Sequence, residues 1–452
     1  MTTLYCARWV LPISSPAISD GGIAVDGQRI ISVASRRTLT RRFPDATVRD
    51  CGDSAIIPGL TNAHSHLELT AMRGFLESEE TDFFAWLKKL TTTRLERMTS
   101  NDLRVSAVWG ACEAVRAGVT CVADASDSAG ESMNALRDVG LRGIVFQESF
   151  GPDPRLAKEN FEKLKTKVAR LRELETTLVK SGVSPHASYT VCAPQLEMIS
   201  RFALDESLPL MMHAAETRME VSLVREGGGP FAEGLRNRGI EWQAPGVSPI
   251  QYLKDHGVLQ THPLLAHCIH VDEADIETLK QTETTVAHCP KSNAKLGHGI
   301  APFRKLLDKG IDVGLGSDSV ASNNTCDLLA EARFALLMAR SKSVGNSQQR
   351  LLSAHEVLET LTVGGARALG LEGQIGELRE GLQADFAVVS LDGAHQIPAY
   401  DPATTLIFSS SASDVSLTVV AGRELYRDGK VITVDDERLR ARMREIAKKL
   451  KS

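Results

Sequence analysis

The chain has 452 residues, of which 42% are hydrophobic and 24% charged, and its formal net charge is −5. This composition is typical of a globular protein with one large domain or a few average ones, and the weak negative charge argues against nucleic-acid binding. No apolar run approaches the ~20 residues of a membrane span, and the N-terminal segment lacks the features of a signal peptide. The eight cysteines are scattered without a CxxC pair, which indicates free thiols in a reducing compartment. We therefore expect a cytoplasmic protein that binds neither nucleic acid nor membranes.

The two ends of the chain both have the pattern of short β-strands. Near the N-terminus, Asp26 and Gly27 separate two alternating apolar runs in GIAVDGQRIISVA, which predicts a hairpin. Similar runs return in LREGLQADFAVVSLDG and SLTVVAGRELYRDGKVITV, before a basic C-terminal helix. Neither piece is long enough to enclose a core alone. We therefore expect residues 1–57 and 370–452 to pair into one small β-sandwich domain.

Residues 58–369 alternate short apolar strands with amphipathic helices. One such helix starts at an N-cap Ser100 or Asn101 and ends at Gly118. Eight strands in this alternation predict a (β/α)8 barrel, an α/β fold. A doubly wound sheet is the alternative, but it would more often carry a glycine-rich phosphate turn after its first strand. The expected strands are 60–66, 119–124, 141–147, 183–186, 208–213, 264–267, 284–288 and 311–318.

Chemically active side chains gather at the C-terminal ends of these expected strands. In a barrel of this kind those ends form one face, and active sites lie there. Six of the 12 histidines fall at such positions, together with one aspartate, so we expect them to share one barrel mouth. They are His64, His66, His186, His213, His267, His288 and Asp318.

Four of these residues have the chemistry of a metal site. His64 and His66 are two residues apart on a strand, so both side chains point to the same side. Alone, such a pair is more often two ordinary packed histidines. With His213 and Asp318 at neighbouring strand ends, three imidazoles and one carboxylate form a ligand set that suits Zn²⁺, with Fe²⁺ as the alternative. Strand four ends in His186 rather than in a lysine that could bridge two ions, which favours one ion per subunit.

Two further residues are candidates for proton transfer. Glu216 follows His213 by three residues and is a candidate general acid, although a glutamate at a helix start is usually a cap. His267 is placed to orient or deprotonate a water molecule. For His288, a contact with substrate and a structural role are equally compatible with the sequence.

The motifs PGLTNAHSHLE, HAAET, LLAHCIH, AHCPKSNAKLGHGIAP and GSDSVASNN together resemble the amidohydrolase superfamily. They are most similar to its branch of methylthioadenosine/S-adenosylhomocysteine deaminases, aminodeoxyfutalosine deaminases and triazine hydrolases. The resemblance covers nearly the whole chain, and the motifs run in the family's order. It implies one metal ion held by His64, His66, His213 and Asp318, and hydrolytic release of ammonia from C6 of an aminopurine.

The resemblance also implies roles for the other residues of the mouth. Glu216 would protonate the ring nitrogen next to C6, and His267 would help to activate the water. Asp318 would pass a proton to the departing ammonia. His186 corresponds to the strand-four histidine that contacts the purine ring in the nucleoside deaminases. The resemblance allows a homo-oligomer.

Residues that would choose the substrate carry a weaker signal. Glu68 in HSHLE and the inserted REGGGPFAEGLRNRGI are similar to the aminodeoxyfutalosine deaminases, whose substrate carries a benzoate carboxylate on an adenine nucleoside. We expect Arg155 to meet that carboxylate. Glu68 either contacts the substrate or caps the loop after the first barrel strand, and His288 is a further candidate for substrate contact. In the methylthioadenosine/S-adenosylhomocysteine deaminases a first-loop glutamate holds the ribose hydroxyls, but here Leu95 takes that position and Glu96 lies one residue away.

The sequence thus favours a zinc-dependent deaminase of an adenine nucleoside, with 6-aminodeoxyfutalosine as the leading substrate. Adenosine, methylthioadenosine and S-adenosylhomocysteine are the other nucleosides considered. A second hypothesis is a triazine-type chlorohydrolase or a guanine or cytosine deaminase. A third is a catalytically inactive barrel that serves as a scaffold, against which the complete ligand set argues.

Overall fold

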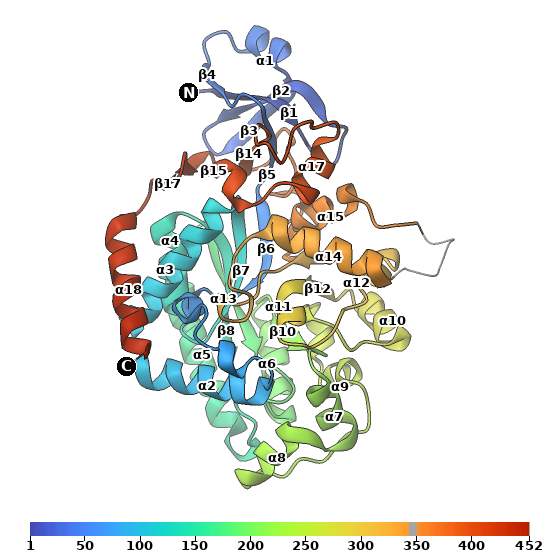
Figure 1. The fold of residues 1–452 in the computed structure, drawn as a ribbon. Helices are drawn as coiled ribbons and strands as arrows, with labels where there is room; N and C mark the ends of the chain where they lie inside the picture. The colour runs from blue at the N-terminus through green and yellow to red at the C-terminus, as the bar shows by residue number, and fades with distance from the viewer. Residues whose placement is uncertain (343–349, 452) are drawn as a thin grey trace.

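The alternation of strand and helix folds into a closed parallel barrel in the computed structural model, which describes residues 1–342 and 350–451 (Figure 1). The strands pair in two runs, β6-β7-β8-β9 and β10-β11-β12-β13. Parallel bridges between Val183 and Leu210 and between Ser65 and Asp318 join the runs at both edges. The predicted (β/α)8 barrel is confirmed. Its strands are β6 (Leu60–Ser65), β7 (Val119–Ser126), β8 (Arg142–Ser149), β9 (Val179–Pro185), β10 (Met211–Ala214), β11 (Leu264–His267), β12 (Thr285–His288) and β13 (Val313–Leu315).

The barrel strands are buried on both faces. Every residue of β7 and β8 is buried, because one face packs inside the barrel and the other under the helices. The last strand, β13, is shorter than the sequence predicts and ends before Asp318. The Asp318 N–H donates to the His64 carbonyl at 2.9 Å, which holds Asp318 beside the end of β6.

Helices surround the barrel and close part of its mouth. The helix predicted from residue 100 is α3 (Ser100–Arg116), and its N-cap is Thr99 rather than Ser100 or Asn101. The Thr99 hydroxyl accepts from the Asp102 N–H while the Asp102 carboxylate accepts from the Thr99 N–H, so the pair satisfies two free donors at once. The other helices of this region are α2 (Phe83–Arg97), α4 (Ala129–Val139), α5 (Ala157–Leu174), α6 (Ala193–Asp205), α7 (Arg218–Glu226), α8 (Gly229–Asn237), α9 (Pro249–Asp255), α10 (Glu273–Gln281), α11 (Pro290–Lys295), α12 (Phe303–Asp308), α13 (Val320–Asn323), α14 (Leu328–Lys342), α15 (Ala354–Leu361) and α16 (Val363–Ala368).

The two ends of the chain form the small β domain that the sequence predicts. Its nine strands make one continuous sheet in which β5 and β14 pair antiparallel and so join the N- and C-terminal pieces. The β2–β3 hairpin turns at Gly27, where φ is +56°. The boundaries at 57/58 and 369/370 stay predictions. The strands are β1 (Thr3–Val10), β2 (Ile18–Asp26), β3 (Arg29–Ser35), β4 (Thr47–Asp50), β5 (Ser54–Pro58), β14 (Phe386–Ser390), β15 (Val415–Val420), β16 (Arg423–Arg427) and β17 (Lys430–Val431), with helices α1 (Arg36–Arg42) and α17 (Pro402–Phe408). The C-terminal helix α18 (Asp436–Lys451) leaves this domain and packs against α3 and α2 of the barrel.

The small domain lies at the N-terminal ends of the barrel strands, away from the mouth (Figure 1). Strand β5 ends at Pro58 and β6 begins at Leu60, so the chain passes directly from one domain into the other. Arg142, the first residue of β8, donates two hydrogen bonds to the buried Asp385 carboxylate, at 2.7 and 3.0 Å. A bidentate buried pair of this kind fixes the domain on the barrel with defined geometry.

The cysteines and helices agree with the compositional predictions where the structure can test them. All eight cysteines are free, and seven are buried while Cys51 is partly exposed. Within residues 1–342 and 350–451, no helix has the length and apolarity needed to cross a membrane.

Candidate active site and metal centre

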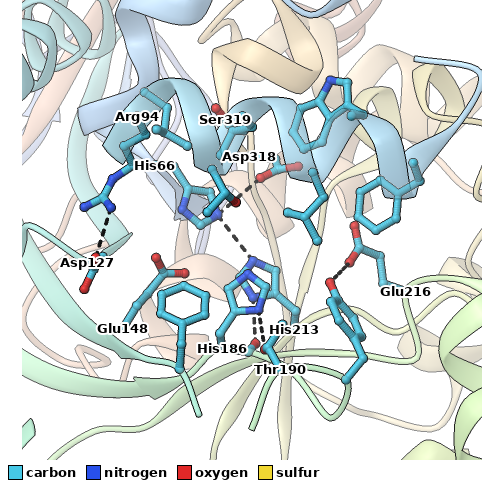
Figure 2. A pocket seen from close by; sticks show the side chains of 18 of the residues that line it. His66, Arg94, Asp127, Glu148, His186, Thr190, His213, Glu216, Asp318 and Ser319 are labelled. Atoms are coloured by element: carbon cyan, nitrogen blue, oxygen red, sulfur yellow. Dashed lines mark hydrogen bonds and ion pairs between the residues drawn. The ribbon is translucent and has the colours of Figure 1, made fainter. Parts of the chain in front are cut away.

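A cavity of about 410 Å³ opens at the C-terminal ends of the barrel strands. This size falls within the usual range for small-molecule sites. Helix α2 covers one side with apolar side chains, and polar groups come from the strand ends below it (Figure 2). The lining residues used below are His66, Glu68, Phe83, Trp86, Arg94, Asp127, Glu148, Phe150, His186, Tyr189, His213, Glu216, Arg238, His267 and Asp318.

Four side-chain atoms converge beside this cavity, from the residues predicted as metal ligands. His66 Nε2 lies 3.3 Å from His213 Nε2 and 3.6 Å from Asp318 Oδ1. His64 Nε2 lies 3.4 Å from the same Asp318 oxygen. One ring nitrogen from each of His64, His66 and His213 lies within 4.8 Å of the other two. We call His64, His66, His213 and Asp318 the metal cluster.

The His66–His213, His64–Asp318 and His66–Asp318 distances of 3.3–3.6 Å fit neighbouring ligands of one zinc ion, whose bonds are about 2.0–2.1 Å long. His213 Nδ1 donates to the backbone carbonyl of His186 at 2.8 Å, so its Nε2 carries a lone pair toward His66. His64 Nε2 is buried, and its neighbour in the metal cluster is Asp318 Oδ1 at 3.4 Å. A cation between these atoms satisfies all of them together.

Partners outside the metal cluster orient its ligands. Ser292 and Ser322 both donate to Asp318 Oδ2, the latter at 2.9 Å, which leaves Oδ1 directed at the histidines. His66 forms a hydrogen bond with the backbone of Ala125. Asp318 and His267 both have left-handed backbones, with φ of +55° and +75°. Such conformations cost about 1–3 kcal/mol and are concentrated at functional sites.

Glu216 and His267 lie next to each other at one end of the cavity. His267 Nδ1 donates to Asn293 Oδ1 at 2.8 Å, so its Nε2 faces Glu216 Oε1, 3.6 Å away. The Tyr189 hydroxyl donates to Glu216 Oε2 at 3.3 Å. Burial raises the pKa of Glu216, and the charge of Asp318 adds to this effect. A buried carboxyl group with a raised pKa beside an oriented imidazole is suited to proton transfer.

His186 lies on the cavity floor beside the metal cluster (Figure 2). Its Nδ1 is 2.9 Å from the Thr190 hydroxyl, and the Phe150 ring packs against it with a centroid distance of 4.8 Å. Burial lowers the pKa of His186 to about 3, so the ring is neutral. The structure thus brings His186 together with the predicted ligands.

Glu68 also lines the cavity, but its carboxylate is fully engaged by the protein. Arg94 Nε donates to Oε1 at 3.0 Å, and the Ser128 N–H donates to Oε2 at 3.1 Å. Arg94 in turn donates to Asp127 Oδ2 at 3.0 Å. Glu68 therefore orders the loop after β6 and the α2 helix above it. We call Glu68, Arg94, Asp127 and Glu148 the acidic wall.

Two predicted substrate contacts lie outside this cavity. Arg155 has a 70% exposed side chain, and its guanidinium is held by Asp153, at 2.7 Å. His288 is buried and stacks on Phe303 with a centroid distance of 4.9 Å, where it lines a separate small cavity. Neither residue lines this cavity, and the predicted substrate contacts of Arg155 and His288 stay predictions. The Arg155 guanidinium is paired with Asp153, two residues earlier in the chain. The His288 side chain points outward from the end of β12, toward Phe303.

Several cavity residues were not predicted from the sequence. Glu148 stands near the end of β8, a position that strand periodicity could have flagged. Arg94 and the stacked pair Phe83 and Trp86 come from α2, whose place over the mouth depends on tertiary packing. Tyr189 belongs to the loop after β9. A lone acid or aromatic residue in a helix or loop carries no motif that identifies it.

Comparison with known proteins agrees with this geometry. The model of the amidohydrolase family matches residues 55–425. The chain belongs to this family. The 5-methylthioadenosine/S-adenosylhomocysteine deaminase of Moorella thermoacetica is 31% identical over 437 residues, which cover 96% of each protein.

Solved structures of amidohydrolases have the same fold over nearly the whole chain. An adenosine deaminase from Xanthomonas campestris with bound zinc superposes with a TM-score of 0.85 at 25% identity, covering 99% of this chain and 98% of that one. The atrazine chlorohydrolase of Arthrobacter aurescens, complexed with zinc, also has a TM-score of 0.85 at 25% identity, covering 98% of this chain and all of the other. Zinc is thus bound by relatives that share this barrel.

Proposed function

We propose that this amidohydrolase is a zinc-dependent deaminase of adenine nucleosides, with one zinc ion per subunit bound by the metal cluster. The observation that carries the proposal is the convergence of three imidazole nitrogens and one carboxylate oxygen beside Glu216. His66 Nε2 lies 3.3 Å from His213 Nε2, and Asp318 Oδ1 lies 3.4 and 3.6 Å from His64 and His66. The reaction consumes water, replaces the C6 amino group of the purine with oxygen, and releases ammonia.

The residues around the metal cluster have complementary roles in this proposal. The metal, when bound, supplies Lewis acidity that activates water at neutral pH. Glu216 donates a proton to N1 of the purine, the ring nitrogen next to C6. His267 holds the attacking water through its Nε2, because its Nδ1 is fixed by Asn293. Asp318 would accept a proton from the attacking water and pass it to the leaving ammonia.

The walls of the cavity fit a flat heteroaromatic ring. Phe83 and Trp86 stack on each other at 5.9 Å on the α2 side, and Phe150 lies by His186. The face of neutral His186 can contact the purine ring beside Phe150. Aromatic faces favour offset or edge contacts with such a ring.

Within this class, we propose that the substrate is 6-aminodeoxyfutalosine, a nucleoside with a carboxylate far from the purine. Arg238 supports this choice because it is exposed, lines the cavity and directly follows α8, in the segment inserted after β10. In this proposal Arg238, rather than Arg155, binds the substrate carboxylate. Methylthioadenosine and S-adenosylhomocysteine are the next candidates, since curated relatives bear those names.

A triazine-type reaction is the second candidate function, because the atrazine chlorohydrolase is equally similar in fold. A catalytically inactive scaffold is disfavoured, since the metal cluster, Glu216 and His267 are all positioned. We further propose a cytoplasmic location, and a homo-oligomer on family resemblance alone.

The test is an assay of the zinc-loaded protein with a panel of nucleosides and triazines. The proposal predicts ammonia release from an adenine nucleoside with conversion to the inosine-type product. Activity on a chlorotriazine with none on adenine nucleosides would favour the second candidate.

A further inference from the structure

The proposed mechanism leaves the buried Glu148 carboxyl group of the cavity unused. Glu148 is the second-last residue of β8 and is 7% exposed, and it points into the cavity (Figure 2). Its Oε1 is buried and has no hydrogen-bond partner in the described part of the chain. Because buried polar atoms are rarely left unsatisfied, this oxygen points to a ligand that completes it.

The surroundings of Glu148 select a neutral ligand rather than an anion. Its neighbours include the carboxylates of Glu68 and Asp127, and the nearby cation, Arg94, is already bonded to both. Burial raises the pKa of Glu148 well above its usual range, and the charges of these acids add to the effect. A phosphate or carboxylate would be repelled here. A hydroxyl group could both donate to and accept from this carboxyl group.

His186 offers a second hydrogen-bonding atom next to Glu148. Thr190 donates its hydroxyl proton to the Ala187 carbonyl, so it accepts from His186 Nδ1–H. The Nε2 of His186 therefore carries a lone pair. Ligand atoms of Glu148, His186 and His213 lie within 4.8 Å of one another. No direct hydrogen bond joins the Glu148 side chain to His186 among the described contacts, so both remain available to a substrate.

A second metal ion does not fit between these residues. The Nδ1 of His213 donates to the His186 carbonyl, and its Nε2 faces His66 in the metal cluster. His213 thus has no nitrogen left for another ion. Only Glu148 and His186 would remain, which is too few protein ligands for a typical zinc site.

We propose that Glu148, with His186, binds a sugar hydroxyl of the substrate, and so selects nucleosides over free bases and triazines. This inference rests on the proposed function. Figure 2 shows Glu216 and Glu148 on opposite sides of the His66–His213 pair. A purine whose N1 meets Glu216 therefore extends its sugar toward Glu148. The exposed Leu95 cannot hydrogen-bond a ribose hydroxyl, so the Glu148 carboxyl group takes that role from the end of β8.

The test compares E148A and E148Q with the wild type on adenosine, 2′-deoxyadenosine and 3′-deoxyadenosine. The wild type should prefer adenosine over at least one deoxy analogue by roughly 10- to 100-fold in kcat/KM. E148A should lose that preference through a fall in adenosine turnover alone, and E148Q should keep part of it. Zinc content and thermal unfolding should match the wild type. E197Q, which changes an exposed glutamate of α6, serves as the matched control.

The outcomes separate this inference from the proposed function. Equal losses on all three nucleosides in E148A and E148Q, or an unchanged preference, would overturn the role of Glu148. Two zinc ions in the wild type and one in E148A would do the same. If the wild type deaminates no nucleoside, the proposed function fails. Thermal-shift binding of adenosine and adenine to wild type and E148A then decides whether Glu148 recognises a sugar: the inference requires that E148A lose only the adenosine shift.

Discussion

The metal cluster and the acidic wall line the same cavity but are held in different ways. Each ligand of the metal cluster keeps one atom directed inward while a partner fixes the rest, as Ser322 does for Asp318. In the acidic wall Arg94 donates to both Glu68 and Asp127 and so joins the two carboxylates. The first arrangement suits capture of an ion, and the second builds a rigid surface with one open carboxyl group, Glu148. The metal cluster proposed for catalysis and the Glu148 carboxyl group proposed for substrate selection therefore belong to different parts of the cavity.

The largest effect should follow loss of a metal ligand. H66A or D318N removes one of four converging atoms, so the protein should lose zinc and at least about 10⁴-fold in kcat/KM. Metal analysis of the purified variant and an ammonia-release assay measure the two quantities. Full activity without bound metal would contradict the role of the metal cluster.

Glu216 should affect turnover without affecting metal binding. E216Q keeps the shape of the side chain but cannot cycle a proton, so kcat should fall by about 10²- to 10⁴-fold. Zinc content should stay at the wild-type value. Wild-type turnover in E216Q would exclude the general-acid role.

The acidic wall should be more important for folding than for chemistry. R94M leaves Glu68 buried with no cationic partner, at a cost of about 3–5 kcal/mol in the free energy of unfolding. R155M breaks an exposed pair and should leave thermal unfolding unchanged, which makes it the matched control. Equal stability of both variants would show that the acidic wall is not a structural unit.

A smaller effect on kcat is expected for Asn293, which accepts a hydrogen bond from His267 Nδ1. N293A removes the acceptor that fixes His267 Nδ1, so kcat should fall by roughly 10- to 100-fold with zinc retained. A shifted pH profile of kcat, recovered in part by N293D, would separate positioning from general damage. An unchanged pH profile and kcat would mean that His267 needs no such partner.

Strand periodicity made the barrel and the metal cluster predictable, because the ends of parallel strands must share one face. Histidines and an aspartate at those ends had a recognisable chemistry. Glu148 occupies an equivalent position at β8, but a lone glutamate has no motif. Arg94 could not be predicted, since its location depends on how α2 packs over the mouth. The sequence also contains the partner of Arg155: the Asp153 carboxylate, two residues earlier, forms an ion pair with its guanidinium.

The most direct test of the central claim is ammonia release by the zinc-loaded wild-type protein acting on adenine nucleosides, 6-aminodeoxyfutalosine included. The account predicts stoichiometric ammonia and inosine-type product, lost when a chelator removes the metal and restored by zinc. A protein that holds one zinc ion per chain yet releases no ammonia from any adenine nucleoside would contradict it.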